Sequence, residues 1–177
     1  MRLYLRGSRA RDLTIFAMLG AMMFTSRILT MILPPNMHML GLFIAAITLT
    51  YRKRALIPLY IFILLDGVYH GFSIWWVPYL YVWLPLWGAF MLAGKINLPA
   101  KAKAPIFMIL CALHGLSFGT LYAPAQAFFF RLSFQGMIAW IIAGLPFDVM
   151  HAVGNFAAAT LIIPLAALLK KLDSGRF

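Results

Sequence analysis

The residues of this sequence that could do chemistry are few, and they lie within strongly apolar stretches. The chain has 177 residues, of which only four are acidic. One of them, Asp148, belongs to the segment GLPFDVMHAVGN, in which His151 and Asn155 follow it at offsets of three and seven. These offsets place the three side chains on one face of a helix. A carboxylate beside an imidazole can relay protons or bind a polar ligand, and it can equally clamp two helices together.

A second polar group lies at the end of the third apolar stretch, where Asp66 is followed by His70. Arg27, near the end of the first apolar stretch, is expected at the same depth. Since an unpaired charge is costly inside a membrane, we expect an ion pair between Arg27 and Asp66. His114, in the fifth apolar stretch, is expected at the depth of Asp148, which predicts a network of Asp and His between the last two helices. Structural and ligand-binding roles are both open for these groups.

Aromatic side chains are concentrated in the segment GFSIWWVPYLYVWLPLW, from residue 71 to residue 87. Several of its rings would lie near one face of a continuous helix. A row of large rings suits a flat, weakly charged ligand, although packing within the protein is the more common use of such a row. We expect a substrate site in the outward half of the molecule, formed by this row, the first loop and the end of the third apolar stretch. Its predicted residues are Asn36, His38, Asp66, His70, Trp76, Tyr79 and Trp83.

The elements that position these residues are predicted to be membrane-spanning helices. Hydrophobic residues make up 64% of the chain and charged residues 11%, and the mean hydropathy is +0.91. These values are typical of an integral membrane protein. A crossing needs about 20 apolar residues, and the apolar runs predict six transmembrane helices in a single all-α domain over residues 1–177. The runs cover residues 13–33, 37–51, 55–69, 77–94, 105–123 and 136–160.

The net charge of +11 has a simple explanation in the membrane topology. Most basic residues form four groups between the apolar runs, and six crossings place all four groups on one side of the membrane. By the positive-inside rule, that side is cytoplasmic and so are both termini. The charge therefore predicts topology, with no nucleic acid as a partner. The four groups are Arg2, Arg6, Arg9 and Arg11; Arg52, Lys53 and Arg54; Lys95, Lys101 and Lys103; and Lys170, Lys171 and Arg176.

Familiar catalytic motifs do not account for these residues. The segment GAFMLAGKI departs from a phosphate-binding loop in its glycine spacing and in lacking the final Ser or Thr. The spacing of His and carboxylate residues predicts no metal site, and we expect no cofactor and no catalytic residue. Two competing hypotheses stay open: a small membrane enzyme that uses Asp148, His151 and His114, and a structural subunit of a larger membrane complex.

The first apolar stretch, TIFAMLGAMMFTSRI, contains small residues at short spacing: Ala17, Gly20 and Ala21. Small residues on a membrane helix usually mark the close approach of another backbone. The segment Ala17-Met18-Leu19-Gly20-Ala21 resembles the AxxxA motif of the S components, the substrate-binding membrane subunits of energy-coupling factor (ECF) vitamin transporters. The chain length, the six predicted helices and the GLPFDVMHAVGNF segment resemble the same family.

This resemblance implies a multi-pass protein of the bacterial cell membrane. Its partners would be a membrane coupling protein, docked on Ala17, Gly20 and Ala21, and two cytoplasmic ATPase subunits that supply the energy. Its ligand would be a vitamin captured at the outer face, and the chain looks most like the cobalamin-specific members. Riboflavin, pantothenate or a thiamine precursor are the alternatives. The side chains of Arg27, His114, Asp148, His151 and Asn155 are expected to form a structural polar network.

Overall fold

The computed structural model describes residues 2–29, 39–97 and 99–174, and within them all regular elements are helical, as predicted. Asn36 and His38, two residues of the predicted substrate site, lie outside the described residues. The helices are α1 (Arg2–Leu29), α2 (Leu40–Tyr51), α3 (Leu56–His70), α4 (Tyr79–Val82), α5 (Leu84–Ala93), α6 (Ala100–Leu116), α7 (Phe118–Phe130), α8 (Phe134–Ala158) and α9 (Ile162–Asp173). Short 3-10 turns are η2 (Arg52–Ala55), η3 (Ile74–Trp76) and η4 (Ala159–Leu161).

Local breaks divide two of the predicted long helices. The helix expected over residues 77–94 is interrupted at Trp83, between α4 and α5, where Pro85 occupies the first turn of α5. Proline fits a first helical turn but not a helix interior, because it lacks an N–H and fixes its φ angle. The helix expected over residues 105–123 is interrupted at Ser117, between α6 and α7. Both breaks leave backbone groups without partners inside their own helices.

Four helical segments of the described residues are long and apolar enough to cross a membrane: Ala10–Leu29, Ile74–Ala93, Lys101–Phe130 and Phe134–Asp173. The last spans 40 residues, and at about 1.5 Å per residue it is about twice as long as the hydrocarbon core is thick. By contrast, α2 and α3 have 12 and 15 residues, or about 18 and 23 Å. By length and composition, the four long segments are typical of a membrane protein.

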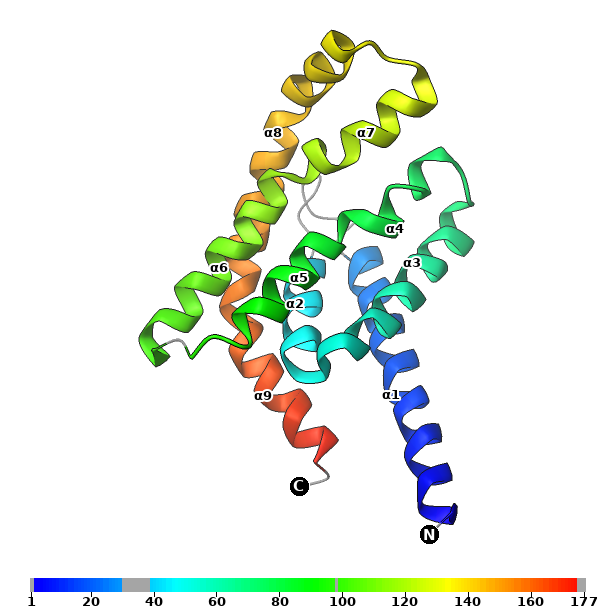
Figure 1. The fold of residues 1–177 in the computed structure, drawn as a ribbon, viewed down its shortest axis with the longest axis vertical. Coiled ribbons are helices and arrows are strands. Elements are labelled where there is room, and N and C mark those ends of the chain that lie inside the picture. The colour runs from blue at the N-terminus through cyan, green and yellow to red at the C-terminus, as the bar shows by residue number, and fades with distance from the viewer. Residues whose placement is uncertain (1, 30–38, 98, 175–177) are drawn as a thin grey trace.

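The first part of α1, the turn between α2 and α3, and the last part of α9, which all carry basic residues, lie toward the end of the molecule that carries both termini (Figure 1). Arg11 of α1 donates hydrogen bonds to the carbonyl oxygens of Leu172 and Asp173, at 3.1 and 2.8 Å. Arg54, in the turn between α2 and α3, forms an ion pair of 2.6 Å with Asp12. The turn between α7 and α8 lies at the opposite end (Figure 1). The described basic groups therefore share one end, as the charge pattern predicted.

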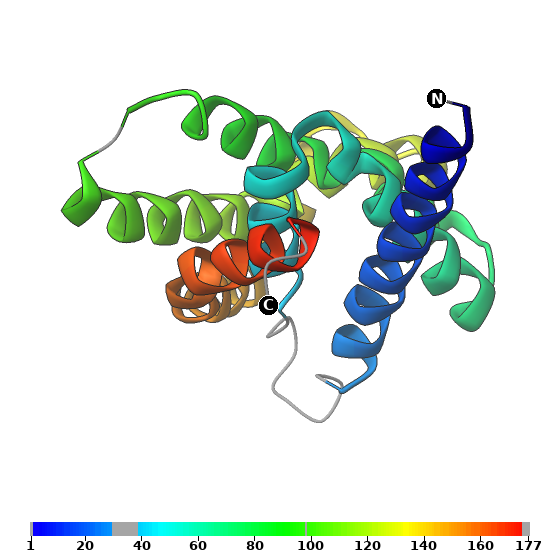
Figure 2. The same ribbon diagram turned by 90° about the horizontal axis from the view of Figure 1, so that it is seen from below.

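The helices pack in two neighbourhoods joined by α2. On one side α1 lies along α3, and on the other α6 lies along α8, as the view from below shows (Figure 2). Helix α2 contacts both α5 and α9, and eight of its residues are buried. The apolar core is built mainly from side chains of α1, α2, α3, α5, α6 and α9, and Phe62, Phe90 and Trp83 are among its largest buried members.

The small residues of α1 face two different surroundings. Ala17 and Ala21 are exposed, whereas Gly20 is buried. A Cβ atom on Gly20 would lie 2.5 Å from Cγ2 of Ile61 and 3.0 Å from the carbonyl oxygen of Pro58, both on α3. The prediction that Gly20 takes part in docking a partner protein is therefore wrong, because Gly20 packs against α3 inside the molecule. Consecutive residues of an α-helix differ by about 100° in direction, which leaves Ala21 exposed while Gly20 packs on α3.

We expect Gly20→Leu to separate α1 from α3 and to destabilise the fold, because the new side chain would overlap Ile61 and the α3 backbone. Overpacking of this kind costs about 1–3 kcal/mol or more. Ala17→Leu is the matched control, since Ala17 is exposed one turn earlier on the same helix. Thermal unfolding in detergent micelles compares them. Equal stability of the two variants would contradict the α1–α3 contact.

Candidate functional site

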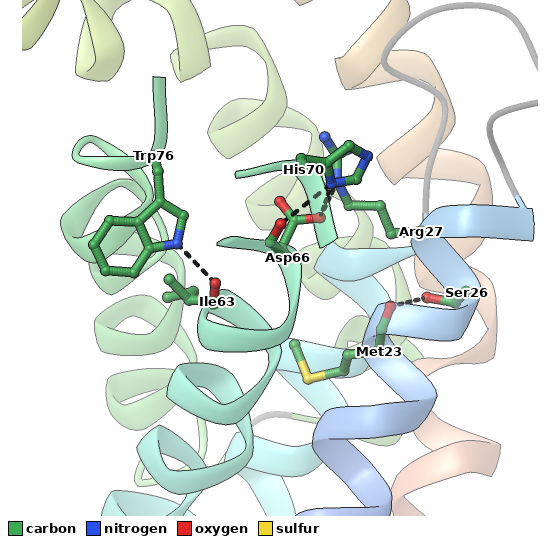
Figure 3. Close-up of polar contacts among 7 residues, drawn as sticks. All are labelled: Met23, Ser26, Arg27, Ile63, Asp66, His70 and Trp76. Carbon is green, nitrogen blue, oxygen red and sulfur yellow. Dashed lines mark hydrogen bonds and ion pairs between the residues drawn. The ribbon is translucent and has the colours of Figure 1, made fainter. Parts of the chain in front are cut away.

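The first polar group forms where the end of α1 meets the end of α3. Nε of Arg27 lies 3.1 Å from Oδ1 of Asp66, and Nδ1 of His70 lies 3.2 Å from the same oxygen (Figure 3). The Asp66 side chain has no solvent exposure, whereas the side chains of Arg27 and His70 are 26% and 28% exposed. The predicted ion pair is confirmed. It joins α1 to α3 through the buried carboxylate of Asp66 and the partly exposed guanidinium of Arg27.

A row of aromatic rings leads inward from this ion pair. The Arg27 guanidinium lies 5.7 Å from the ring centroid of Tyr79, within the range of a cation–π contact. Tyr79 packs edge-on against Trp75 and Trp83, at centroid distances of 5.5 and 5.7 Å, and Trp83 lies 5.3 Å from Phe118. Trp83 is 1% exposed. The four rings of Trp75, Tyr79, Trp83 and Phe118, called the aromatic row below, connect the ion pair to the interior.

Trp76 does not join the aromatic row. Its Nε1 donates to the carbonyl oxygen of Ile63 at 2.8 Å, and its ring packs against Phe72. It lies apart from Arg27, Asp66 and His70 (Figure 3). The expected face assumed helical spacing from Trp76 onward, but η3 and the turn at Val77 precede α4. Trp75 takes the expected place, because its ring contacts both His70 and Tyr79.

The second polar group is centred on Asp148, which is 4% exposed. Its two carboxylate oxygens accept hydrogen bonds from the backbone N–H of Gly119, at 3.0 and 3.2 Å. Gly119 lies in the first turn of α7, and Ser117 at the start of that helix makes no side-chain cap. A carboxylate is the preferred partner at a helix N-terminus, where the backbone N–H groups carry partial positive charge. Asp148 on α8 therefore caps α7.

The histidines next to Asp148 have different neighbours from those predicted. Nε2 of His114 lies 2.8 Å from the carbonyl oxygen of Val82, at the end of α4. The ring of His114 lies 6.5 Å from that of His151, and Phe118 packs against His151 at 4.9 Å. The two histidines predicted for one Asp–His network thus contact each other, while Asp148 binds the backbone of Gly119 and His114 binds that of Val82. The helix breaks at Trp83 and Ser117 leave the carbonyl group of Val82 and the N–H group of Gly119 without helical partners, and the side chains of His114 and Asp148 bind them instead.

The predicted buried face of α8 is confirmed, since Asp148, His151 and Asn155 are all buried. Nδ2 of Asn155 donates to the carbonyl oxygen of Cys111 on α6, at 3.2 Å. A Cβ atom on Gly41 of α2 would lie 2.9 Å from Oδ1 of Asn155. Asn155 thus sits where three helices approach closely, and its position is that of a packing residue.

Sequence reasoning missed three residues that connect the groups: Trp75, Phe118 and Gly119. Phe118 touches Trp83, Tyr79 and His151. The available signal was the segment HGLSFGT after His114, in which Gly, Ser and Gly together disfavour an uninterrupted helix. A break there brings Phe118 and Gly119 to the same level as Asp148.

Removing Arg27 should cost more stability than removing the charge of Asp66. Arg27→Gln leaves a fully buried carboxylate without its cation, which typically costs about 3–5 kcal/mol. Asp66→Asn leaves an arginine side chain that is 26% exposed and can reach water. This variant should therefore lose less stability than Arg27→Gln. Unfolding of both single variants and of the double variant gives the coupling energy. Equal losses from both single variants would contradict the buried position of the carboxylate.

Gly119→Ala should destabilise the junction of α6 and α7. The new Cβ atom would lie 2.5 Å from Oδ2 of Asp148 and would displace the capping carboxylate, with an expected loss of about 1–3 kcal/mol. Gly88→Ala in α5 is the control, because a Cβ atom there meets nothing within 4 Å. Amide hydrogen exchange at the start of α7 should rise only in Gly119→Ala. Unchanged exchange there would show that Asp148 is not the cap.

The site combines ionisable side chains with aromatic surface. Its ionisable side chains already contact each other or backbone groups, and the aromatic row supplies apolar and stacking contact. Within residues 2–29, 39–97 and 99–174, no group of three or more His, Cys or Asp side chains is placed to hold a metal ion. Comparison of the chain with protein-family models, curated proteins and solved structures gives no match.

Proposed function

We propose that this protein is the substrate-binding membrane subunit of an energy-coupling factor transporter. It captures a vitamin at the outer face of a bacterial cell membrane. In this proposal the chain crosses the membrane six times with cytoplasmic termini, and α2 and α3, although shorter than the hydrocarbon core is thick, are the second and third crossings. A membrane coupling protein and two cytoplasmic ATPases supply the energy, because nothing in the sequence resembles an ATPase site.

The exposure of Ala17 and Ala21 is the observation that carries this proposal. Both are exposed on α1, whereas Gly20 between them packs on α3. Their neighbour Met18 is 60% exposed. Because alanine side chains are small, a second helix can approach the α1 backbone closely here. This surface is the proposed docking site for the coupling protein.

Ligand capture is proposed at the outer end of the aromatic row. The ion pair of Arg27 and Asp66 supplies a polar anchor, and Trp75 and Tyr79 supply aromatic surface beside it. A few polar groups in an apolar, aromatic surrounding are typical of small-molecule sites. Trp83 is buried among protein side chains, so a ligand that reaches it has to separate α4 from α7.

Cobalamin is the first vitamin to test, since a large and weakly charged compound suits many rings and few charges. Riboflavin, pantothenate and thiamine precursors follow. The competing hypothesis of a membrane enzyme is weakened by the geometry of Asp148, because its carboxylate is occupied by the N–H of Gly119 instead of activating a histidine. A structural subunit would bind no small molecule.

Ala17→Leu/Ala21→Leu tests the docking surface. Because both residues are exposed, the variant should fold and bind the vitamin with unchanged affinity, while the added bulk blocks close approach of the coupling protein. We expect loss of copurification with the coupling protein and loss of vitamin uptake. Binding is followed by titration with cobalamin and then with the other vitamins.

Leu13→Ala/Met22→Ala provides the control, because it changes two other exposed positions of α1 without adding bulk. Intact assembly of Ala17→Leu/Ala21→Leu would refute the docking surface. Failure of the unmodified chain to bind any small molecule would refute the transport function itself.

A further inference from the structure

A cavity of about 330 Å³ opens between the ends of four helices, on the side of the molecule that carries the termini. It is formed by the end of α2 with the turn that follows it, the end of α5, the start of α6, and α9 from Ile163 to Lys170. Its apolar lining includes Leu49, Phe107 and Ile163. Three cations also line it: Arg52, Lys103 and Lys170. The cavity thus combines apolar contact with positive charge.

Arg52 is held in place at this cavity. Its guanidinium donates to the carbonyl oxygen of Met91, in the last turn of α5. The side chain passes directly over Gly94, where a Cβ atom would collide with Nη1. A cation is favoured at a helix C-terminus, because the last carbonyl groups carry partial negative charge. The charge of Arg52 is therefore fixed at the cavity and loses little freedom when it binds an anion.

Among the described residues, none of the ion pairs joins a carboxylate to these three cations. Its acidic side chains are the four aspartates of the sequence. Asp12 pairs with Arg54, Asp66 pairs with Arg27, and Asp148 caps α7. Asp173, the fourth, is in none of the ion pairs found among the described residues. Those pairs also leave out Arg52, Lys103 and Lys170.

The start of α6 adds to the positive potential at the cavity. Its first turn contains no acidic residue, and Pro99 gives no side-chain cap. Lys101 and Lys103 lie close to this start. Lysines near a helix N-terminus are unfavourable, because the free N–H groups there are also positive. An anion bound in the cavity would compensate both the helix and the lysines.

We propose that this cavity binds the phosphate group of an anionic phospholipid. Arg52, Lys103 and Lys170 contact the phosphodiester, and the apolar lining contacts the glycerol and upper acyl region. A soluble phosphate would use the same cations but would leave the apolar lining unused. The cavity lies at the end of segments long enough to cross a membrane, which is the level of lipid headgroups, and basic pockets between such helices bind anionic headgroups. The inference is independent of the transport function.

The test uses the full chain in detergent micelles, titrated with short-chain phosphatidylglycerol, short-chain phosphatidylcholine or inorganic phosphate. The thermal unfolding midpoint and lipid retention in native mass spectrometry report binding. We expect phosphatidylglycerol to raise the midpoint saturably. Lys103→Gln/Lys170→Gln should weaken its binding about tenfold. Both lysines are exposed, so this variant should fold normally.

Lys53→Gln/Lys171→Gln is the matched control, since it removes two exposed lysines that do not line the cavity. Lys103→Arg/Lys170→Arg keeps the charge and should bind like the unmodified chain. The proposal fails if the control loses binding equally, if Lys103→Gln/Lys170→Gln binds normally, or if phosphatidylcholine binds as tightly. An equal effect of inorganic phosphate at the same concentrations would assign the cavity to a soluble anion instead.

Discussion

The buried carboxylate of Asp66 is the constraint on which the arrangement of α1 depends. A negative charge without solvent exposure is tolerated only beside a cation and hydrogen-bond donors. Arg27 reaches it from α1, and His70 reaches it from the next turn of α3. Because Gly20 also lets α1 approach α3 closely, the ion pair and the glycine together fix which face of α1 lies inward. As a result, Ala17 and Ala21 are exposed on the surface of the molecule.

The other buried polar side chains obey the same constraint at the breaks between helices. An interrupted helix leaves N–H and C=O groups that water cannot reach in an apolar interior. Asp148 satisfies the N–H of Gly119, and His114 lies against the carbonyl oxygen of Val82. These side chains are thus tied to the kinks that shape the interior. The kinks in turn bring Phe118 against Trp83 and complete the aromatic row.

The two ends of the molecule differ in the balance of charged and aromatic side chains. One end combines the ion pair of Arg27 and Asp66 with aromatic rings, which suits an apolar ligand with a polar anchor. The other end gathers Arg52, Lys103 and Lys170 around one cavity. The chain has 15 Lys and Arg residues against four aspartates, so its positive charge exceeds its negative charge. The solvent or the membrane has to provide the anions.

The sequence by itself determined the all-helical class, the common end of the basic groups, the pairing of Arg27 with Asp66 and the buried face of α8. These follow from hydropathy, from the scarcity of acidic residues and from the helical repeat, all of which are local or compositional. Only the tertiary structure decided that Trp75 and not Trp76 joins the row, that Gly20 faces α3 and that Asp148 binds Gly119. Each depends on where a helix breaks and which neighbour lies beside it. Such contacts join residues far apart in the chain, and no spacing in the sequence encodes them.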